Sequence, residues 1–106
     1  MSSLVPPDQL DAVAQRFRLL SEPVRLELLN LLHAEGEMTV SDLVDATGHR
    51  QANVSKHLGR MAEDHLVARR QDGVYVYYSV CDPTLAALVQ LVLGRLNADI
   101  GPDPDG

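Results

Sequence analysis

The chain contains very few of the residues that build disulfide-linked or aromatic-rich folds. Among its 106 residues there are one cysteine, no tryptophan, one phenylalanine and three tyrosines. A single cysteine cannot form an intramolecular disulfide, which excludes the small secreted scaffolds that depend on such bonds. The core must therefore consist mainly of Leu, Val and Ala. We expect one small domain that completes its core by forming a homodimer.

Long apolar runs are also absent. No stretch approaches 18 consecutive apolar residues, so the sequence predicts no transmembrane helix and no membrane partner. The first residues, MSSLVPPDQLD, lack the basic start and the apolar stretch of a signal peptide. We therefore expect a cytoplasmic protein.

Recognisable catalytic motifs are missing as well. The sequence has no Gly-rich phosphate loop, no CxxC or HExxH motif, and no Ser/His/Asp set in a plausible cleft. His33 and His49 stand alone and are expected at the surface. We therefore expect that the protein is not an enzyme.

Negative charge predominates, but it is unevenly distributed. The formal net charge is −6, which argues against indiscriminate binding to nucleic acid. Residues 49–73 nevertheless contain five Lys and Arg against three Asp and Glu, a net charge of +2. The remainder contains four against twelve, a net charge of −8. A molecule with this distribution could turn one basic face toward DNA.

The spacing of apolar residues predicts two helices in the first third of the chain. The first covers residues 8–20. Ser21 is expected to cap the second, with Pro23 in its first turn, where the missing N–H costs nothing. Gly36 is expected to end it.

Two further helices are predicted after Gly36, separated by a short turn that contains glycine. Thr39 and Asp42 resemble a capping box that opens a short third helix, which stops at Gly48. A fourth helix begins near Arg50. Two helices joined in this way are typical of a helix-turn-helix.

A β-hairpin follows the fourth helix. Asp72 and Gly73 favour a two-residue type I′ turn, in which both central residues have positive φ. Side chains alternate along the second strand, and Arg69 and Arg70 on the first strand point to opposite faces. Only one of these two arginines can therefore meet a given surface.

The last helix is expected to begin with Asp82 as its N-cap and Pro83 as its first residue. It is apolar over more than one face, which is too much for one side of a small domain. We expect the surplus to pack against a second copy of the chain, together with the first helix.

The outward face of the fourth helix carries small residues, hydrogen-bonding residues and cations. Ala52 and Gly59 would allow a close approach to a surface, while Asn53, Ser55 and Lys56 could contact base edges or phosphates. A polar stripe of this kind is more often an ordinary solvated helix face. The adjoining basic hairpin favours DNA binding.

The order of these elements resembles the ArsR/SmtB family of winged helix-turn-helix repressors. The resemblance extends from Leu10 to Leu96 through LLSEPVRLELLNLL, VSDLVDATG, QANVSKHLGRM, LVARRQDGVYVYYSV and the final helix that begins with DP. It implies a mainly α fold with a small β-hairpin, in which the first and last helices form a homodimer. The winged helix-turn-helix domain would cover 8–97, with flexible tails at 1–7 and 98–106.

The resemblance also implies a repressor that sits on a near-palindromic double-stranded DNA operator until a signal releases it. The candidate DNA contacts lie at the third helix, on the fourth helix and in the hairpin, which would be the wing. They are Thr39, Arg50, Gln51, Ala52, Asn53, Ser55, Lys56, His57, Arg60, Arg69, Arg70 and Gly73.

Three positions depart from the family pattern. Arg50 replaces the Ser that often caps the recognition helix, and a cation there opposes the helix dipole unless phosphates are close. We therefore interpret Arg50 as a DNA contact. His65 replaces a helix-ending Gly, and His tolerates the left-handed conformation better than most residues. Val74 replaces a frequent wing Arg, which indicates a weaker phosphate contact there.

The sensing sites that the family resemblance implies are mostly missing. Thr39 and Ser41 occupy the positions of a thiolate pair, Arg60 and Asp64 those of a cysteine pair, and the last helix contains no His. We therefore expect no bound metal or other cofactor. A non-standard metal site of His57, Met61 and His65 stays open as a less favoured alternative, as does a winged-helix module that binds protein instead of DNA.

Cys81, just before the last helix, leaves two interpretations open. It is either a small packed hydrophobic residue or a thiol whose pKa the helix dipole lowers, which would make it a redox sensor. The first is the commoner role of a lone cysteine. The sequence thus specifies a DNA-binding surface in more detail than a sensing site.

Overall fold

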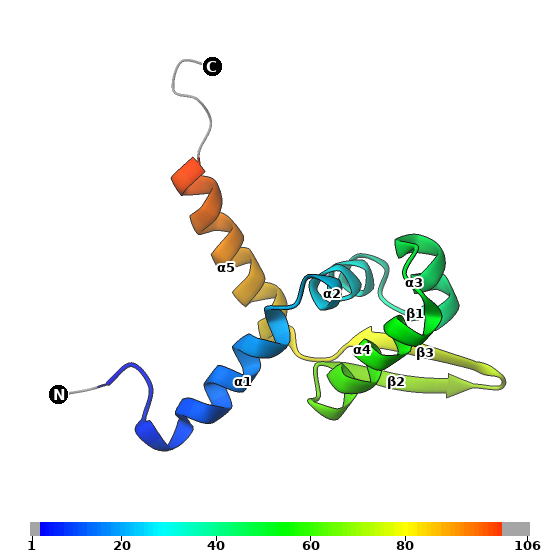
Figure 1. The fold of residues 1–106 in the computed structure, drawn as a ribbon, viewed down its shortest axis with the longest axis horizontal. Helices are drawn as coiled ribbons and strands as arrows, with labels where there is room; N and C mark the ends of the chain where they lie inside the picture. The colour runs from blue at the N-terminus through cyan, green and yellow to red at the C-terminus, as the bar shows by residue number, and fades with distance from the viewer. Residues whose placement is uncertain (1–2, 101–106) are drawn as a thin grey trace, which may run out of the picture.

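The computed structural model describes residues 3–100 as a body of helices and a small sheet, from which two helices project (Figure 1). A short 3-10 turn, η1 (Pro7–Gln9), precedes the first helix. The elements in chain order are then α1 (Leu10–Leu20), α2 (Pro23–Glu35), β1 (Met38–Thr39), α3 (Val40–Thr47), α4 (Gln51–Glu63), β2 (Val67–Asp72), β3 (Tyr75–Val80) and α5 (Pro83–Ile100). Residues 98–100, which we expected in a tail, belong to α5, and the rest of the expected C-terminal tail lies outside the described residues.

The sheet has three antiparallel strands in the order β1-β3-β2. β2 and β3 form the expected hairpin, with Val67 opposite Val80. β1 was not expected from the sequence; its Met38 lies opposite Tyr78 and its Thr39 lies opposite Tyr77. A strand of two residues is too short to show alternation, and it forms only because β3 offers a free edge.

The hairpin turn differs from the expected one by one residue. Asp72 still pairs with Tyr75, so the two loop residues are Gly73 and Val74. Gly73 has φ +62°, whereas Asp72 and Val74 do not have positive φ. Glycine at the first central position with positive φ there alone is the pattern of a type II′ turn, which corrects the predicted type I′ turn centred on Asp72 and Gly73.

Most helix ends are determined by residues close to them in the sequence. The capping box of α3 is present: Thr39 Oγ1 accepts from the Asp42 amide at 3.1 Å, and Asp42 Oδ2 accepts from the Thr39 amide at 3.0 Å. His65 adopts φ +62° after α4, as its tolerance of that region suggested. The N-cap of α2 is Glu22 rather than Ser21, because the Glu22 carboxylate reaches the Arg25 amide at 3.0 Å.

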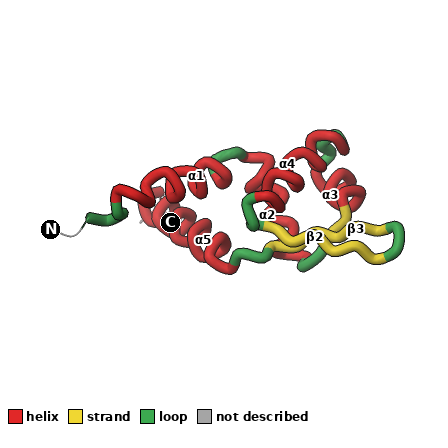
Figure 2. The backbone as a smooth tube through the Cα atoms, turned by 90° about the horizontal axis from the view of Figure 1, so that it is seen from below, coloured by secondary structure: helices red, strands yellow, loops and turns green. Residues whose placement is uncertain are grey.

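The core is built mainly from α2, α3 and α4, and the first helix, the hairpin and α5 add a few side chains to it. Its fully buried side chains are Leu28, Leu32, Leu43, Val54, Leu58, Met61 and Leu66. α1 and α5 are both at the opposite end from the hairpin tip (Figure 2) and leave large apolar side chains exposed. No helix in residues 3–100 is long and apolar enough to cross a membrane.

Candidate nucleic-acid interface

The turn between α3 and α4 sets the position of the fourth helix. Gly48 ends α3 in the left-handed conformation, and its amide donates to the Val44 carbonyl at 2.8 Å. α4 then begins at Gln51 and buries Val54, Leu58 and Met61 completely. This burial holds one side of α4 against the core, so its opposite side must face solvent.

The outward side of α4 consists of the residues that the sequence analysis selected. Gln51, Ala52, Ser55, Lys56 and Arg60 are exposed, and Asn53 is half-buried. A Cβ placed on Gly59 would meet no atom within 4 Å, so this stretch is open to a large partner. The face combines two cations, hydrogen-bonding groups and small residues, which is a composition suited to a DNA groove.

Arg50 is the N-cap residue of α4 and contributes no capping hydrogen bond from its side chain. Its backbone is extended (φ −68°, ψ 144°), and its carbonyl accepts from the amides of Asn53 and Val54. The side chain is exposed at the end of the helix where the dipole is positive. The local geometry would suit a Ser, so the cation gives no stabilisation to the helix itself.

His57 is placed differently from the other expected contacts. Its side chain is buried, with 9% of the residue exposed, and its Nδ1 accepts a hydrogen bond of 3.2 Å from Arg25 Nε. Glu22 Oε2 lies 3.8 Å from Nε2 on the other side of the ring. Burial is the main cause that lowers the pKa of His57, and Arg25 and Lys56 lower it further against the opposing effect of Glu22. This placement corrects the expectation of a DNA contact: His57 joins α4 to α2.

Two of the five cations in residues 49–73 are neutralised within the chain. Arg60 Nε donates to Asp64 Oδ2 at 3.0 Å along α4. Arg70 makes a bidentate pair with Glu37 (2.7 and 3.3 Å), and its guanidinium lies 4.7 Å from the centre of the Tyr77 ring. The hydrogen bond from Arg70 is the main cause that lowers the pKa of Glu37.

The remaining three cations make no ion pair or side-chain hydrogen bond within residues 3–98. Arg50, Lys56 and Arg69 are all exposed. Arg69 points to the opposite face of β2 from Arg70, as the alternation predicted. Sequence spacing could not reveal which arginine was paired, since Glu37 lies 33 residues from Arg70.

Thr39 and Gly73 occupy the edges of this surface. The Thr39 hydroxyl is engaged in the capping box, and the residue is half-buried. Gly73 lies at the exposed hairpin tip beside Val74, which is 90% exposed. Both can lie near a bound duplex, but neither brings charge to it.

Arg16 in α1 is a residue that the sequence analysis did not select. Its Nη1 donates to the backbone carbonyl of Asp64, just after α4, at 3.3 Å. The same atom lies 3.6 Å from Asp82 Oδ2 at the start of α5. Asp82 is the expected cap, and its Oδ1 accepts from the Thr84 amide and hydroxyl, which lowers the pKa of Asp82. One side chain thus connects three helices.

The candidate sensing residues do not form a ligand cluster. Cys81 is exposed, and its Sγ donates to the His65 carbonyl at 3.2 Å. Met61 is fully buried, His57 is bonded to Arg25 and His65 is exposed. Within the described part of the chain, no three His, Cys, Asp or Glu residues are grouped so as to hold a metal ion.

A helix-turn-helix whose second helix is open to solvent, followed by a basic hairpin, defines a winged helix-turn-helix protein. Residues 20–70 match the protein family described as a helix-turn-helix domain. A protein of Streptomyces lividans named a probable mercury resistance operon repressor is 40% identical over 87 residues, which is 82% of this chain and 69% of the relative.

Two solved structures share the fold. Rv0081 of Mycobacterium tuberculosis is 30% identical with a TM-score of 0.77, over 90% of this chain and 97% of that one. The antimony-specific repressor AntR is 26% identical with a TM-score of 0.81, over 92% of this chain and 88% of that one. The chain belongs to the ArsR/SmtB family of winged helix-turn-helix transcriptional repressors. These relatives confirm the expected family and fold and agree with the expectation that the protein is not an enzyme.

Proposed function

We propose that the protein is a cytoplasmic homodimeric repressor that binds a near-palindromic operator through α4 and the β2–β3 wing, and that a metal-independent signal releases it. The observation that carries the proposal is which cations of residues 49–73 are already paired with carboxylates of the chain. Arg50, Lys56 and Arg69 are exposed and have no ion-pair partner among the described residues, whereas Arg60 and Arg70 are neutralised by Asp64 and Glu37. Unpaired cations beside an open helix face are available to phosphates.

The exposed apolar residues of α1 and α5 support the homodimer. Phe17 in α1 is 53% exposed, and Leu91 in α5 is 72% exposed. Val92, Leu93 and Leu96 are each about half exposed. An apolar surface of this extent is costly in water, and a second copy would bury it while presenting two recognition helices to two half-sites.

The residues favour a signal other than metal binding. One relative is named for mercury resistance and one structure for antimony. Soft metals of this kind need several thiolates, and each chain here offers one. We propose that no resident metal or cofactor takes part. A metal-responsive repressor with a non-standard site is the alternative, and native mass spectrometry of the purified protein would detect the added mass.

Salt dependence tests the DNA-binding part of the proposal. A duplex is first selected from a random-sequence library with the full-length protein, and its affinity is then measured over a series of salt concentrations. A dimer that uses three cations per subunit neutralises about six phosphates, so log affinity should fall against log salt with a slope of about −5. A slope near zero, or failure to select any sequence, would instead support a module that binds protein.

Cys81 is the proposed point at which a thiol signal would act. Its Sγ contacts the carbonyl of His65, directly after the recognition helix, so oxidation or persulfidation would remove a hydrogen bond at the end of α4. Operator affinity is measured with and without peroxide or a persulfide, in the parent and in Cys81→Ser. A loss of affinity in the parent alone supports the thiol signal, and equal responses in both proteins exclude it.

A further inference from the structure

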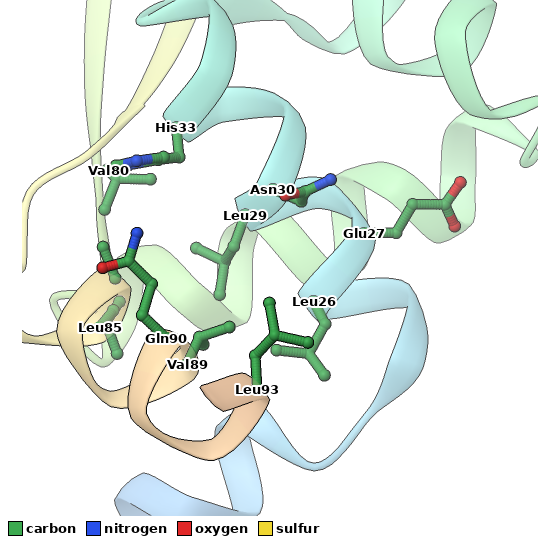
Figure 3. Close-up of a pocket in the computed structure, with 11 residues that line it drawn as sticks. Leu26, Glu27, Leu29, Asn30, His33, Val80, Leu85, Val89, Gln90 and Leu93 are labelled. Carbon is green, nitrogen blue, oxygen red and sulfur yellow. The ribbon is translucent and has the colours of Figure 1, made fainter. Parts of the chain in front are cut away.

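A pocket of about 460 Å³ lies between α2 and α5, away from the face of α4 that is open to DNA. Most of its wall is apolar and comes from these two helices: Leu26 and Leu29 from α2, and Leu85, Val89 and Leu93 from α5 (Figure 3). Pockets of this volume with mostly apolar walls are typical of sites for small molecules.

Three of the lining residues, Asn30, His33 and Gln90, carry hydrogen-bonding groups. Figure 3 shows the His33 ring and the Gln90 amide near Val80, whereas Leu26 and Leu93 lie on the other side. Within the described residues, neither the His33 nor the Gln90 side chain makes a hydrogen bond or an ion pair. Both can therefore donate to and accept from a bound molecule.

The charges around the pocket favour an uncharged ligand. No Lys or Arg lines it, and its carboxylate residue, Glu27, is turned outward (Figure 3). Glu27 Oε2 lies 2.8 Å from His49 Nε2, which holds it away from the cavity. An organic acid would find no fixed positive charge, and a cation would find no carboxylate directed at it.

The pocket adjoins the apolar surface that a second copy would cover, and Leu93 belongs to both. Successive residues of an α-helix are rotated by about 100°, so the pocket-facing side of α5, which carries Leu85, Val89 and Leu93, lies almost opposite Leu91. Among the apolar residues of α5 up to residue 98, Leu91 is the most exposed, at 72%. α5 therefore presents Leu91 to a partner subunit, while Leu85 and Val89 face α2.

We propose that this pocket binds an uncharged, largely apolar small molecule with one hydrogen-bonding group, and that such a ligand changes operator affinity. The second part rests on the proposed function. α2 also contacts α3 and α4, so a molecule inserted between α2 and α5 would move the recognition helix relative to the last helix. The ligand would act independently of the Cys81 thiol.

The test uses N-phenyl-1-naphthylamine, an uncharged apolar fluorophore with one N–H. The full-length protein should enhance its fluorescence saturably. Ala86→Phe fills the pocket and should weaken binding at least about tenfold. The matched control is Ala34→Phe, at an exposed residue of α2 that does not line the pocket, and it should bind the probe like the parent. Absence of saturable binding, or equal binding by both variants, would overturn the proposal.

A second variant keeps the test decisive if Ala86→Phe does not fold. Gln90→Leu keeps an apolar wall but removes the amide, and it should weaken probe binding by about three- to tenfold. Unchanged affinity in Gln90→Leu would overturn the assigned polar contact.

The effect on DNA is measured separately with the selected duplex. Saturating probe should lower operator affinity in the parent and in Ala34→Phe but not in Ala86→Phe. Probe binding without a change in operator affinity would overturn the signalling part. Probe binding by a protein that selects no DNA sequence would refute the proposed function and leave the pocket assignment standing.

Discussion

Arg25 Nε lies 3.2 Å from Nδ1 of His57 and joins the first turn of α2 to the middle of α4. Because Arg is always a donor, Nδ1 of His57 must be unprotonated to accept this bond. Burial lowers the pKa of His57 and favours that neutral form. The contact thus holds the recognition helix in place from its inner side, without adding charge to the interface.

Stability should fall below neutral pH because of His57. The unfolded chain takes up the proton near the ordinary pKa of 6.5, whereas the folded chain takes it up only at lower pH. The full contribution is therefore present above about pH 6.5. It is lost as the pH falls from there toward the lowered pKa of the folded state. The Tm of His57→Gln should depend less on pH between 7.5 and 5.5 than that of the parent. The control His33→Gln, at an exposed His, should keep the parental slope.

Arg50→Ser should stabilise the protein and weaken operator binding. Ser can cap α4 in the observed extended backbone, which contributes about 1 kcal/mol. For a domain of this size that raises Tm by about 4–8 °C. Loss of one cation per subunit should make the salt slope of operator binding shallower by about 2 in the dimer. Thermal melts and salt titrations measure the two effects, and unchanged binding would refute Arg50 as a DNA contact.

The two neighbouring wing arginines should differ in their effect on DNA binding. Arg69→Ala removes an unpaired cation and should reduce both operator affinity and the salt slope. Arg70→Ala removes a cation that Glu37 already neutralises, so it should change affinity much less. Glu37→Gln frees Arg70 and should strengthen binding. Equal losses from Arg69→Ala and Arg70→Ala would show that the Glu37 pair opens when DNA binds.

Arg16→Gln should weaken operator binding with little loss of stability. Arg16 is exposed, so its ion pair with Asp82 contributes less than about 1 kcal/mol. Its contact with the Asp64 carbonyl, however, ties α1 to the end of α4. Arg18→Gln is the control on the same helix, because within the described residues the Arg18 side chain bonds only to Gln15. Equal operator affinities in the two variants would show that the Arg16 contact is dispensable.

Features that depend on neighbouring residues could be predicted from the sequence. The capping box of α3, the glycine ends of α2 and α3, and the left-handed His65 each follow from side chains within a few residues. The outward face of α4 was predictable for a similar reason, since the spacing of Val54, Leu58 and Met61 determines which side is buried. The family resemblance supplied the rest of the fold.

Features that join distant segments could not be predicted in this way. β1 forms only against the edge of β3, and His57 is buried because Arg25 reaches it across the helix pair. The pairing of Arg70 with Glu37 crosses 33 residues, so composition alone overestimated the number of cations available to DNA. The pocket between α2 and α5 likewise combines residues from the two halves of the chain.

The sequence by itself determined the order of the helices, the hairpin and the location of the basic segment, because these depend on periodicity, caps and local charge. Only the tertiary structure decided which cations of that segment are available to DNA. Within residues 3–98 it leaves Arg50, Lys56 and Arg69 unpaired, turns His57 inward and neutralises Arg60 and Arg70. The physical reason is that ion pairing and burial depend on distances in space, and only folding brings Glu37 to Arg70 and Arg25 to His57.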